Sequence, residues 1–455
     1  MSNLSSKRRA DLTTGSVRGH LIRMMLPMIL GLLAMMSINM VDTWFVAQLG
    51  TEQLAAMSFT FPVIMVLISV GIGVMAGTSS VISRVIGSGD EKRVRRLCTD
   101  SIILTSLFAI VFAAIGLLTI DSLFRLLGAD DLLLPLIRQY MTVWYLGYIV
   151  FLVPMAGMGA IRATGDTKRQ SNLMIVAAVI NLVLDPILIF GWLGFPALGI
   201  EGAALASVIG RGATMILGYR VLLDKELLTF ERARLAEIIQ SWKDILHVGL
   251  PAIGTNLIIP LGTGVLLSMV AVYGPTAVAG YGAATRVESL LQVIFYALSG
   301  VIGPFVGQNL GAGRCDRIKE AQIQSAILSV CVGVVLAVVV VLFATPLISL
   351  FSDQKDVINN GTLYLFIVPL SLGPAGIIMV INAAFNGLGK PMPAVAVSTI
   401  RMFLVMVPAS WIGGQLFGLG GIYCGLALAN IIAAILAFKW FSSSILSKTV
   451  EQSAT

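Results

Sequence analysis

Three polar side chains lie inside long apolar stretches of the sequence. Asp42 occurs in SINMVDTWF, and both Asn181 and Asp185 occur in INLVLDPILIF. Residues four apart face the same way on a helix, so we expect Asn181 and Asp185 to share one face. An ionisable group at membrane depth is costly and by default marks a functional site. Since carboxylate and amide oxygens bind a proton or Na⁺, these residues predict a site for a coupling cation.

The alternative for these acids is structural, because a buried carboxylate can also fix helix packing by accepting a hydrogen bond from a hydroxyl or an amide. For Asn181 alone the two interpretations are equally good. For Asp42 and Asp185 we favour the cation site, because no Lys or Arg lies at the same depth on their helices. Two carboxylates without a neighbouring cation draw in a proton or a metal cation.

Weaker candidates for a substrate cavity are other aromatic and polar side chains in apolar stretches. An aromatic stripe at helical spacing is more often core or membrane interface than a ligand site. For Glu288 a structural contact with a neighbouring helix is favoured over a ligand site. The four candidates are Tyr140, Trp44, Glu288 and Asn382.

Catalytic, nucleotide and metal motifs are absent from the sequence. No P-loop occurs, and the glycine-rich GIGVMAG at 71–77 lies in an apolar stretch without the strand and helix that a nucleotide site requires. Two histidines and four scattered cysteines give no metal-ligand spacing. We therefore expect no enzyme, no cofactor and no metal site, and an ion gradient as the source of energy.

The composition places these residues in an all-α polytopic membrane protein. The chain has 455 residues, of which 57% are hydrophobic and 12% charged, whereas a soluble domain carries roughly 25% charged residues. A spanning helix needs about 20 apolar residues. The sequence predicts twelve such helices, at 21–48, 53–84, 95–120, 131–161, 168–192, 198–223, 243–273, 276–308, 318–350, 358–387, 392–416 and 420–445.

Basic residues gather in alternate loops, whereas the loops at 49–52, 193–197, 273–275 and 414–419 have no Lys or Arg. Positive loops stay in the cytoplasm, so we expect both termini to be cytoplasmic. The net charge of +7 is then a property of these loops, and no nucleic-acid partner is expected. The longest connection, 224–242, is polar, and we predict that it is helical.

The two halves of the chain repeat each other at a spacing of 224 residues. Each lobe therefore has six spans, which gives a pseudo-twofold axis along the membrane normal and suits alternating access. The predicted division is 1–223, a linker at 224–242 and 243–455. The matched pairs are Pro27 and Pro251, Gly50 and Gly274, Gly87 and Gly311, Gly89 and Gly313, and Gly165 and Gly389.

The acids break this repeat. Leu266 is the partner of Asp42, and Val407 or Ala409 is the partner of Asp185. Both acids therefore belong to the N-terminal lobe, and the proposed cation site is not duplicated in the second lobe.

Four motifs resemble the MATE (multidrug and toxic compound extrusion) family, in its DinF-like prokaryotic branch. They are LGTEQLAAM after the first span, IGSGDEKR after the second, ATGDTK after the fourth and GIEGAALAS at the start of the sixth. The resemblance implies that Asp42, Asn181 and Asp185 couple transport to a cation. It also implies that Pro27 is a point of helix bending and that Tyr140 lines the cavity.

The resemblance further implies a monomeric antiporter in the inner membrane of a bacterial or archaeal cell. It would export bulky, amphipathic, often cationic compounds in exchange for H⁺ or Na⁺. A span-six threonine of this branch is absent here, where Ala203 to Ala206 lead to Ser207, and this favours H⁺. The alternative is a flippase for lipid-linked precursors, which should carry cations in its cleft.

Overall fold

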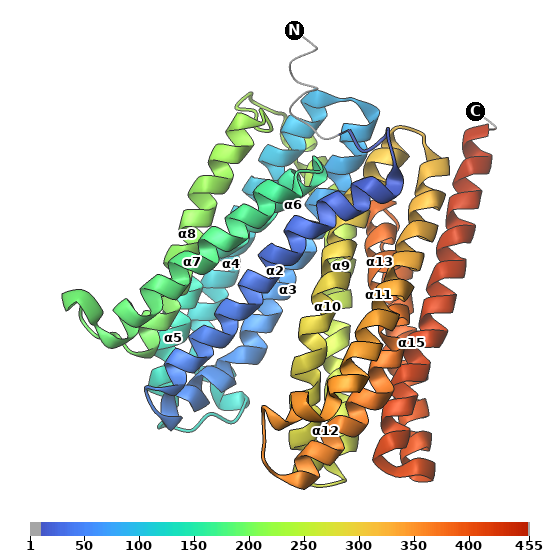
Figure 1. Cartoon of the computed structure of the whole chain (residues 1–455). Helices are drawn as coiled ribbons and strands as arrows, with labels where there is room; N and C mark the ends of the chain where they lie inside the picture. Colours follow the sequence, from blue (N-terminus) through green and yellow to red (C-terminus); the bar gives the residue numbers. More distant parts are fainter. Residues whose placement is uncertain (1–10, 454–455) are drawn as a thin grey trace. The chain divides into compact units, whose positions relative to one another are not determined.

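The computed structural model describes residues 11–453, with side chains described as far as Leu446, and these residues form helices without a strand (Figure 1). Long apolar runs account for most of the helices, because a helix satisfies its own backbone hydrogen bonds away from water. The helices of the first half are α2 (Val17–Ala47), α3 (Thr51–Ser88), α4 (Glu91–Leu126), α5 (Leu134–Leu146), α6 (Tyr148–Ala163), α7 (Thr167–Phe190), η2 (Trp192–Gly194) and α8 (Ile200–Asp224).

The second half continues with the same kind of long apolar helix. Its elements are α9 (Leu235–Ala271), α10 (Pro275–Gly311), α11 (Cys315–Ser349), α12 (Lys355–Ile367), η3 (Val368–Ser371), α13 (Leu372–Gly387), α14 (Met392–Thr399), the π-helix η4 (Ile400–Met406) and α15 (Val407–Ser453).

The described residues form twelve membrane-crossing segments, as the sequence predicts. Nine single helices or joined pairs are long and apolar enough to span, and α5 with α6 makes one more span bent by 44°. The run Met392–Leu446 supplies two, because Gly418 breaks it with φ 64° and ψ −147°. The bend at Gly147 interrupts the segment that the sequence predicts as one span at 131–161.

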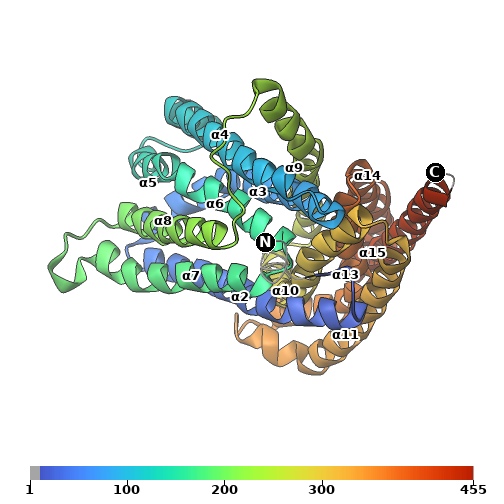
Figure 2. The same ribbon diagram turned by 90° about the horizontal axis from the view of Figure 1, so that it is seen from above.

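The chain divides into two compact units, and Figure 2 shows their helices from above. Unit 1 contains Leu26–Leu250, and unit 2 contains Asp11–Met25 and Pro251–Thr455. The bounds of these units differ from those of the predicted lobes, and two segments are exchanged. The start of α2 groups with unit 2, and the start of α9 groups with unit 1. Both exchanges end next to the prolines that the repeat pairs, Pro27 and Pro251.

Within unit 2, Arg317 holds the segment that precedes α2. Its guanidinium donates hydrogen bonds to three backbone carbonyls of this segment, those of Leu12 (3.1 Å), Thr14 (3.1 Å) and Gly15 (2.8 Å). Asn309 adds a bond to the Leu12 carbonyl at 3.1 Å. Bonds from a charged donor are stronger than neutral ones. The start of α2 is therefore fixed to unit 2.

The repeat has a conformational basis at its glycines. A positive φ is strained for residues with a Cβ and is routine for glycine, which explains why glycine occupies these turns in both halves. Three of the matched pairs have a positive φ in both members: Gly50 and Gly274 (139° and 97°), Gly89 and Gly313 (80° and 70°), and Gly165 and Gly389 (82° and 72°).

The prediction of a helix over 224–242 is wrong for its first part. The chain from Lys225 to Arg234 is not helical, and α9 begins only at Leu235. Side chains of α4 bind this linker instead. The Thr99 hydroxyl donates to the Thr229 carbonyl at 3.1 Å and accepts from its N–H at 3.0 Å. These backbone groups are satisfied without a helix.

Close packing of α7 on α8 positions the predicted site, and the two helices lie side by side in Figure 1. A Cβ on Gly202 would lie 2.4 Å from the Leu188 carbonyl oxygen, and one on Gly210 would lie 3.0 Å from that of Ala177. Glycine at these two positions lets the backbones approach, as small residues do between membrane helices. This approach brings Asn181 of α7 to Ser207 of α8.

Candidate functional site

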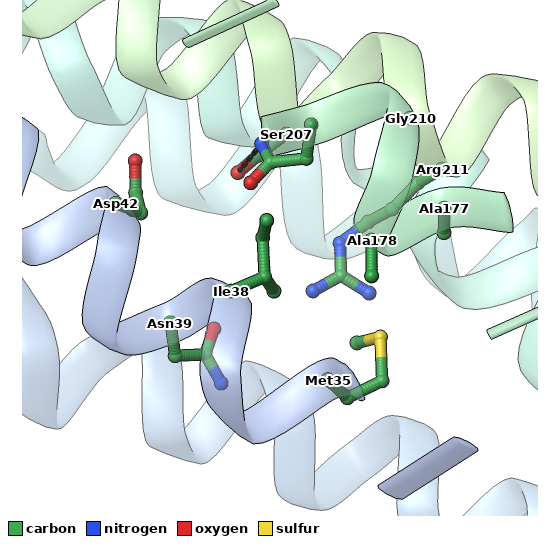
Figure 3. Close-up of a pocket in the computed structure, with 10 residues that line it drawn as sticks. Met35, Ile38, Asn39, Asp42, Ala177, Ala178, Ser207, Gly210 and Arg211 are labelled. Carbon is green, nitrogen blue, oxygen red and sulfur yellow. Dashed lines mark hydrogen bonds between the residues drawn. The ribbon is translucent and has the colours of Figure 1, made fainter. Parts of the chain in front are cut away.

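A small cavity in unit 1 is lined by α2, α7 and α8 (Figure 3). It has a volume of about 30 Å³, which is the volume that one water molecule occupies in the liquid. The cavity fits a proton, a water or a small ion, and it is too small for a drug-sized molecule. Its polar lining residues are Asn39 and Asp42 of α2, Asn181 of α7, and Ser207 and Arg211 of α8.

Asn181 links the second predicted acid to α8. Its amide lies 3.3 Å from the Asp185 carboxylate and 3.2 Å from the Ser207 hydroxyl. The orientation that satisfies both neighbours has the amide NH₂ donating to Asp185 and the amide oxygen accepting from Ser207. Asp185 is fully buried. One polar cluster is thus formed by Asn181, Asp185 and Ser207.

Asp42 faces this cluster from α2. Its side chain is buried, with 8% of the residue exposed, and its Oδ1 has no hydrogen-bond partner among the described residues. Asp42 and Asp185 are close enough to interact electrostatically. A buried oxygen without a donor costs free energy unless water or an ion fills the gap. Asp42 is therefore the group of this cavity that is open to a ligand.

Tyr140 of α5 approaches the same acids from another side. It is buried, and its hydroxyl lies within electrostatic range of Asp42, Asp185 and Arg211. Tyr140 does not line the small cavity, and its role in the site stays a prediction.

Arg211 is the site residue that sequence reasoning missed. It lies four residues after Ser207 on α8 and lines the cavity with Asp42. Arg211 lies on α8, whereas the two acids lie on α2 and α7. The carboxylates therefore have a neighbouring cation, and the prediction that they have none is wrong. The signal was present as a lone arginine inside the apolar stretch ASVIGRGATMIL.

The remaining candidates lie elsewhere. Trp44 is 60% exposed and packs against Phe45, with ring centroids 5.0 Å apart. Glu288 belongs to unit 2, where it accepts hydrogen bonds from the Tyr364 hydroxyl and from Gln292. Asn382, also in unit 2, donates to Ser398 at 3.0 Å. The structure does not bring these three residues to the Asp42 cavity.

Pro27 lies within α2, which continues through it. A proline has no N–H, so one helical hydrogen bond is missing at this point. The Ser171 hydroxyl of α7 donates to the Pro27 carbonyl. Bending at Pro27 stays a prediction.

In the described part of the chain no group of three His, Cys, Asp or Glu residues could hold a metal ion.

The MatE family model matches the chain twice, once in each half of the repeat, at residues 27–187 and 251–412. A protein of Shewanella oneidensis named FAD transporter is 36% identical over 95% of this chain and 96% of its own length. The probable multidrug resistance protein YoeA of Bacillus subtilis is 28% identical over 86% of each chain.

Solved structures agree with these relatives. The MATE transporter VcmN of Vibrio cholerae, in its bent form, matches with a TM-score of 0.92 and 31% identity over 97% of this chain and 99% of that one. A transporter of the MOP superfamily from Pyrococcus furiosus matches with a TM-score of 0.87 and 26% identity, over 96% and 97% of the two chains.

Proposed function

Because the chain belongs to the MatE family of membrane transporters, we propose that it exports amphipathic, cationic compounds in exchange for protons by alternating access. Asp42, Asn181 and Asp185 form the coupling site, with Ser207 as its hydroxyl. Multidrug resistance and multidrug export are the roles named for several relatives, and the proposal extends this role to the present chain.

The single observation that carries this proposal is the Asp42 carboxylate, buried in a cavity of about 30 Å³ with one oxygen unpartnered. A proton taken up there removes a charge that is costly at membrane depth. It also removes the attraction that holds a cationic compound. Protons and substrate therefore compete, and exchange follows from this competition.

Protons suit the site better than Na⁺. A metal cation needs several oxygens that converge on it, but the Asn181 amide is already engaged by Asp185 and Ser207. A proton bonds to one carboxylate oxygen and needs no other ligand.

A second candidate substrate is a flavin dinucleotide. The 36% identical relative named FAD transporter favours it. A guanidinium in the cavity is also a group that binds phosphate. In this case the substrate is anionic, and it would bind together with protons instead of competing with them.

Purified protein in proteoliposomes tests the proposal. We expect ethidium transport to follow an imposed ΔpH and to ignore an imposed Na⁺ gradient, and we expect Asp42→Asn to abolish the ΔpH response. Vesicles loaded with FAD form the parallel arm. Transport of FAD with no transport of ethidium would favour the second candidate, and dependence on Na⁺ alone would contradict proton coupling.

We also propose that the protein lies in the inner membrane with the linker and both termini in the cytoplasm. Arg232 in the linker is exposed, so a cysteine placed there can be labelled by an impermeant maleimide. The background must lack Cys331 and Cys424, which are exposed themselves. Labelling of Arg232→Cys from outside intact cells would contradict this orientation.

A further inference from the structure

The cavity contains a permanent positive charge as well as its acids. Arg211 is partly exposed, and Figure 3 shows its guanidinium between Ala178 of α7 and the side chains of Met35 and Ile38 of α2. An arginine side chain keeps its proton in proteins. Its charge therefore stays in the cavity whatever the protonation of Asp42 and Asp185.

Aromatic rings hold this guanidinium without neutralising it. It lies over the Phe151 ring at 4.3 Å from the ring centroid and 5.9 Å from that of Trp144. None of the ion pairs in the described part of the chain involves Arg211. A cation–π contact stabilises a cation and leaves its charge in place. Arg211 is thus free to act electrostatically on a proton in the cavity and on a charged compound bound next to the cavity.

The charge of the site follows from three groups. Asp42 of α2, Asp185 of α7 and Arg211 of α8 give one net negative charge when both carboxylates are ionised, and one net positive charge when both are protonated. Tyr140 of α5 is the other titratable group that faces them, and a phenol is neutral at physiological pH.

We propose that Arg211 is the residue that selects substrates by charge, so that compounds with one positive charge are preferred to compounds with two. One positive charge neutralises the proton-free site. After two protons bind, the site is positive and expels the compound. Without Arg211 the proton-free site would carry two negative charges and suit a dication, and the protonated site would be neutral and would not repel its substrate. This inference rests on the proposed function.

The test compares binding of ethidium, with one permanent charge, and propidium, with two, to the purified full-length protein in detergent at alkaline pH. Arg211→Gln should shift the ratio of the two dissociation constants toward propidium by about tenfold or more. Arg211→Lys keeps the charge and should keep the wild-type ratio. Arg220→Gln removes an exposed charge of the same helix outside this cavity and is the matched control.

An unchanged ratio in Arg211→Gln would overturn the inference, as would a shift of equal size in Arg220→Gln. Saturable FAD binding that only Arg211→Gln abolishes would also overturn it, because Arg211 would then hold an anion. If Arg211→Gln does not fold, Arg211→Met is used in its place, because methionine keeps a long side chain against the Phe151 ring. Binding is measured without a pH gradient. If proton coupling fails, the ratio of the two dissociation constants therefore still tests the role of Arg211.

Discussion

The amide of Asn181 donates a hydrogen bond to the carboxylate of Asp185, one turn further along α7, at 3.3 Å. The same amide reaches Ser207 on α8. One of the two acids is thus held by its own helix and the next, while Asp42 on α2 keeps an oxygen without a partner. The two carboxylates therefore have different environments: Asp185 is held by a hydrogen bond, and Asp42 is open to a ligand.

Asp42→Asn should abolish ΔpH-driven ethidium transport and leave the protein folded. Asparagine has the same shape but cannot release and rebind a proton, and the loss of a buried unpaired charge does not disturb packing. The measurement is the initial rate in proteoliposomes, with size-exclusion elution as the check on folding. Glu52→Gln, an exposed acid in the first turn of α3, is the control and should keep the wild-type rate. Transport by Asp42→Asn at this rate would refute the coupling role.

Much of this fold could be predicted from apolar length and from the repeat. Twelve spans follow from runs of about 20 apolar residues, and the paired glycines follow from turns that need a positive φ. The helical spacing of Asn181 and Asp185 also gave their contact, because that contact is local.

Features that depend on contacts between distant segments could not be predicted. Arg211 belongs to the site because α8 turns it toward α2, and hydropathy does not specify how a helix is rotated in its bundle. The linker after Lys225 is irregular because Thr99 of α4 binds it, and its own sequence has a helix-like composition. The exchange of Asp11–Met25 into unit 2 depends on Arg317, which is about 300 residues away along the chain.

Gly202→Ala should destabilise unit 1 and weaken the site. The new Cβ would meet the Leu188 carbonyl oxygen at 2.4 Å, so α7 and α8 must separate, at a cost of about 1–3 kcal/mol. Asn181 and Ser207 would then part. We expect a lower midpoint of thermal unfolding in detergent and slower transport.

The same substitution at Gly212, on the same helix, is the matched control. A Cβ there has no atom within 4 Å, and alanine favours a helix by about 1 kcal/mol over glycine. Gly212→Ala should therefore keep or raise the midpoint. Equal midpoints for the two variants would show that close packing at Gly202 does not support the site.

Asp166 should make the stability of the protein depend on pH. Burial raises the pKa of this carboxyl, but hydrogen bonds from Lys225 and the Arg169 N–H, with their charges, bring the pKa below its ordinary value. A lowered pKa in the folded state contributes stability above the unfolded value of about 3.9, and this contribution disappears as the pH falls through the folded pKa.

Asp166→Asn isolates this effect, because asparagine caps a helix as well as aspartate does. The variant should be less stable than wild type by about 1 kcal/mol at pH 6, and the difference should shrink below about pH 4 and vanish once the pH has fallen below the folded pKa. Thermal unfolding in detergent across this range measures it. Asp90→Asn is the control, since Asp90 caps α4 through the Arg93 N–H and has no ion pair among the residues that the structure describes. A difference that grows toward acid pH would contradict the assignment.

Asp42→Asn and Asp185→Asn should be non-additive. Moving a transporter decisively from one conformation to the other takes about 5.5 kcal/mol of differential binding, and the coupling ion acts only through its different affinities for the two states. One titrating acid supplies about 1.4 kcal/mol for each unit by which its pKa differs between states. A single acid with a modest difference is insufficient, so we expect both to titrate as one unit. Each single variant should then lose most ΔpH-driven transport, and the double variant should be little worse than either. Initial rates of the four proteins in the same vesicles, at equal amounts of folded protein, make the comparison. If each single variant keeps substantial transport and the two losses multiply in the double variant, the acids act independently and the shared site is excluded.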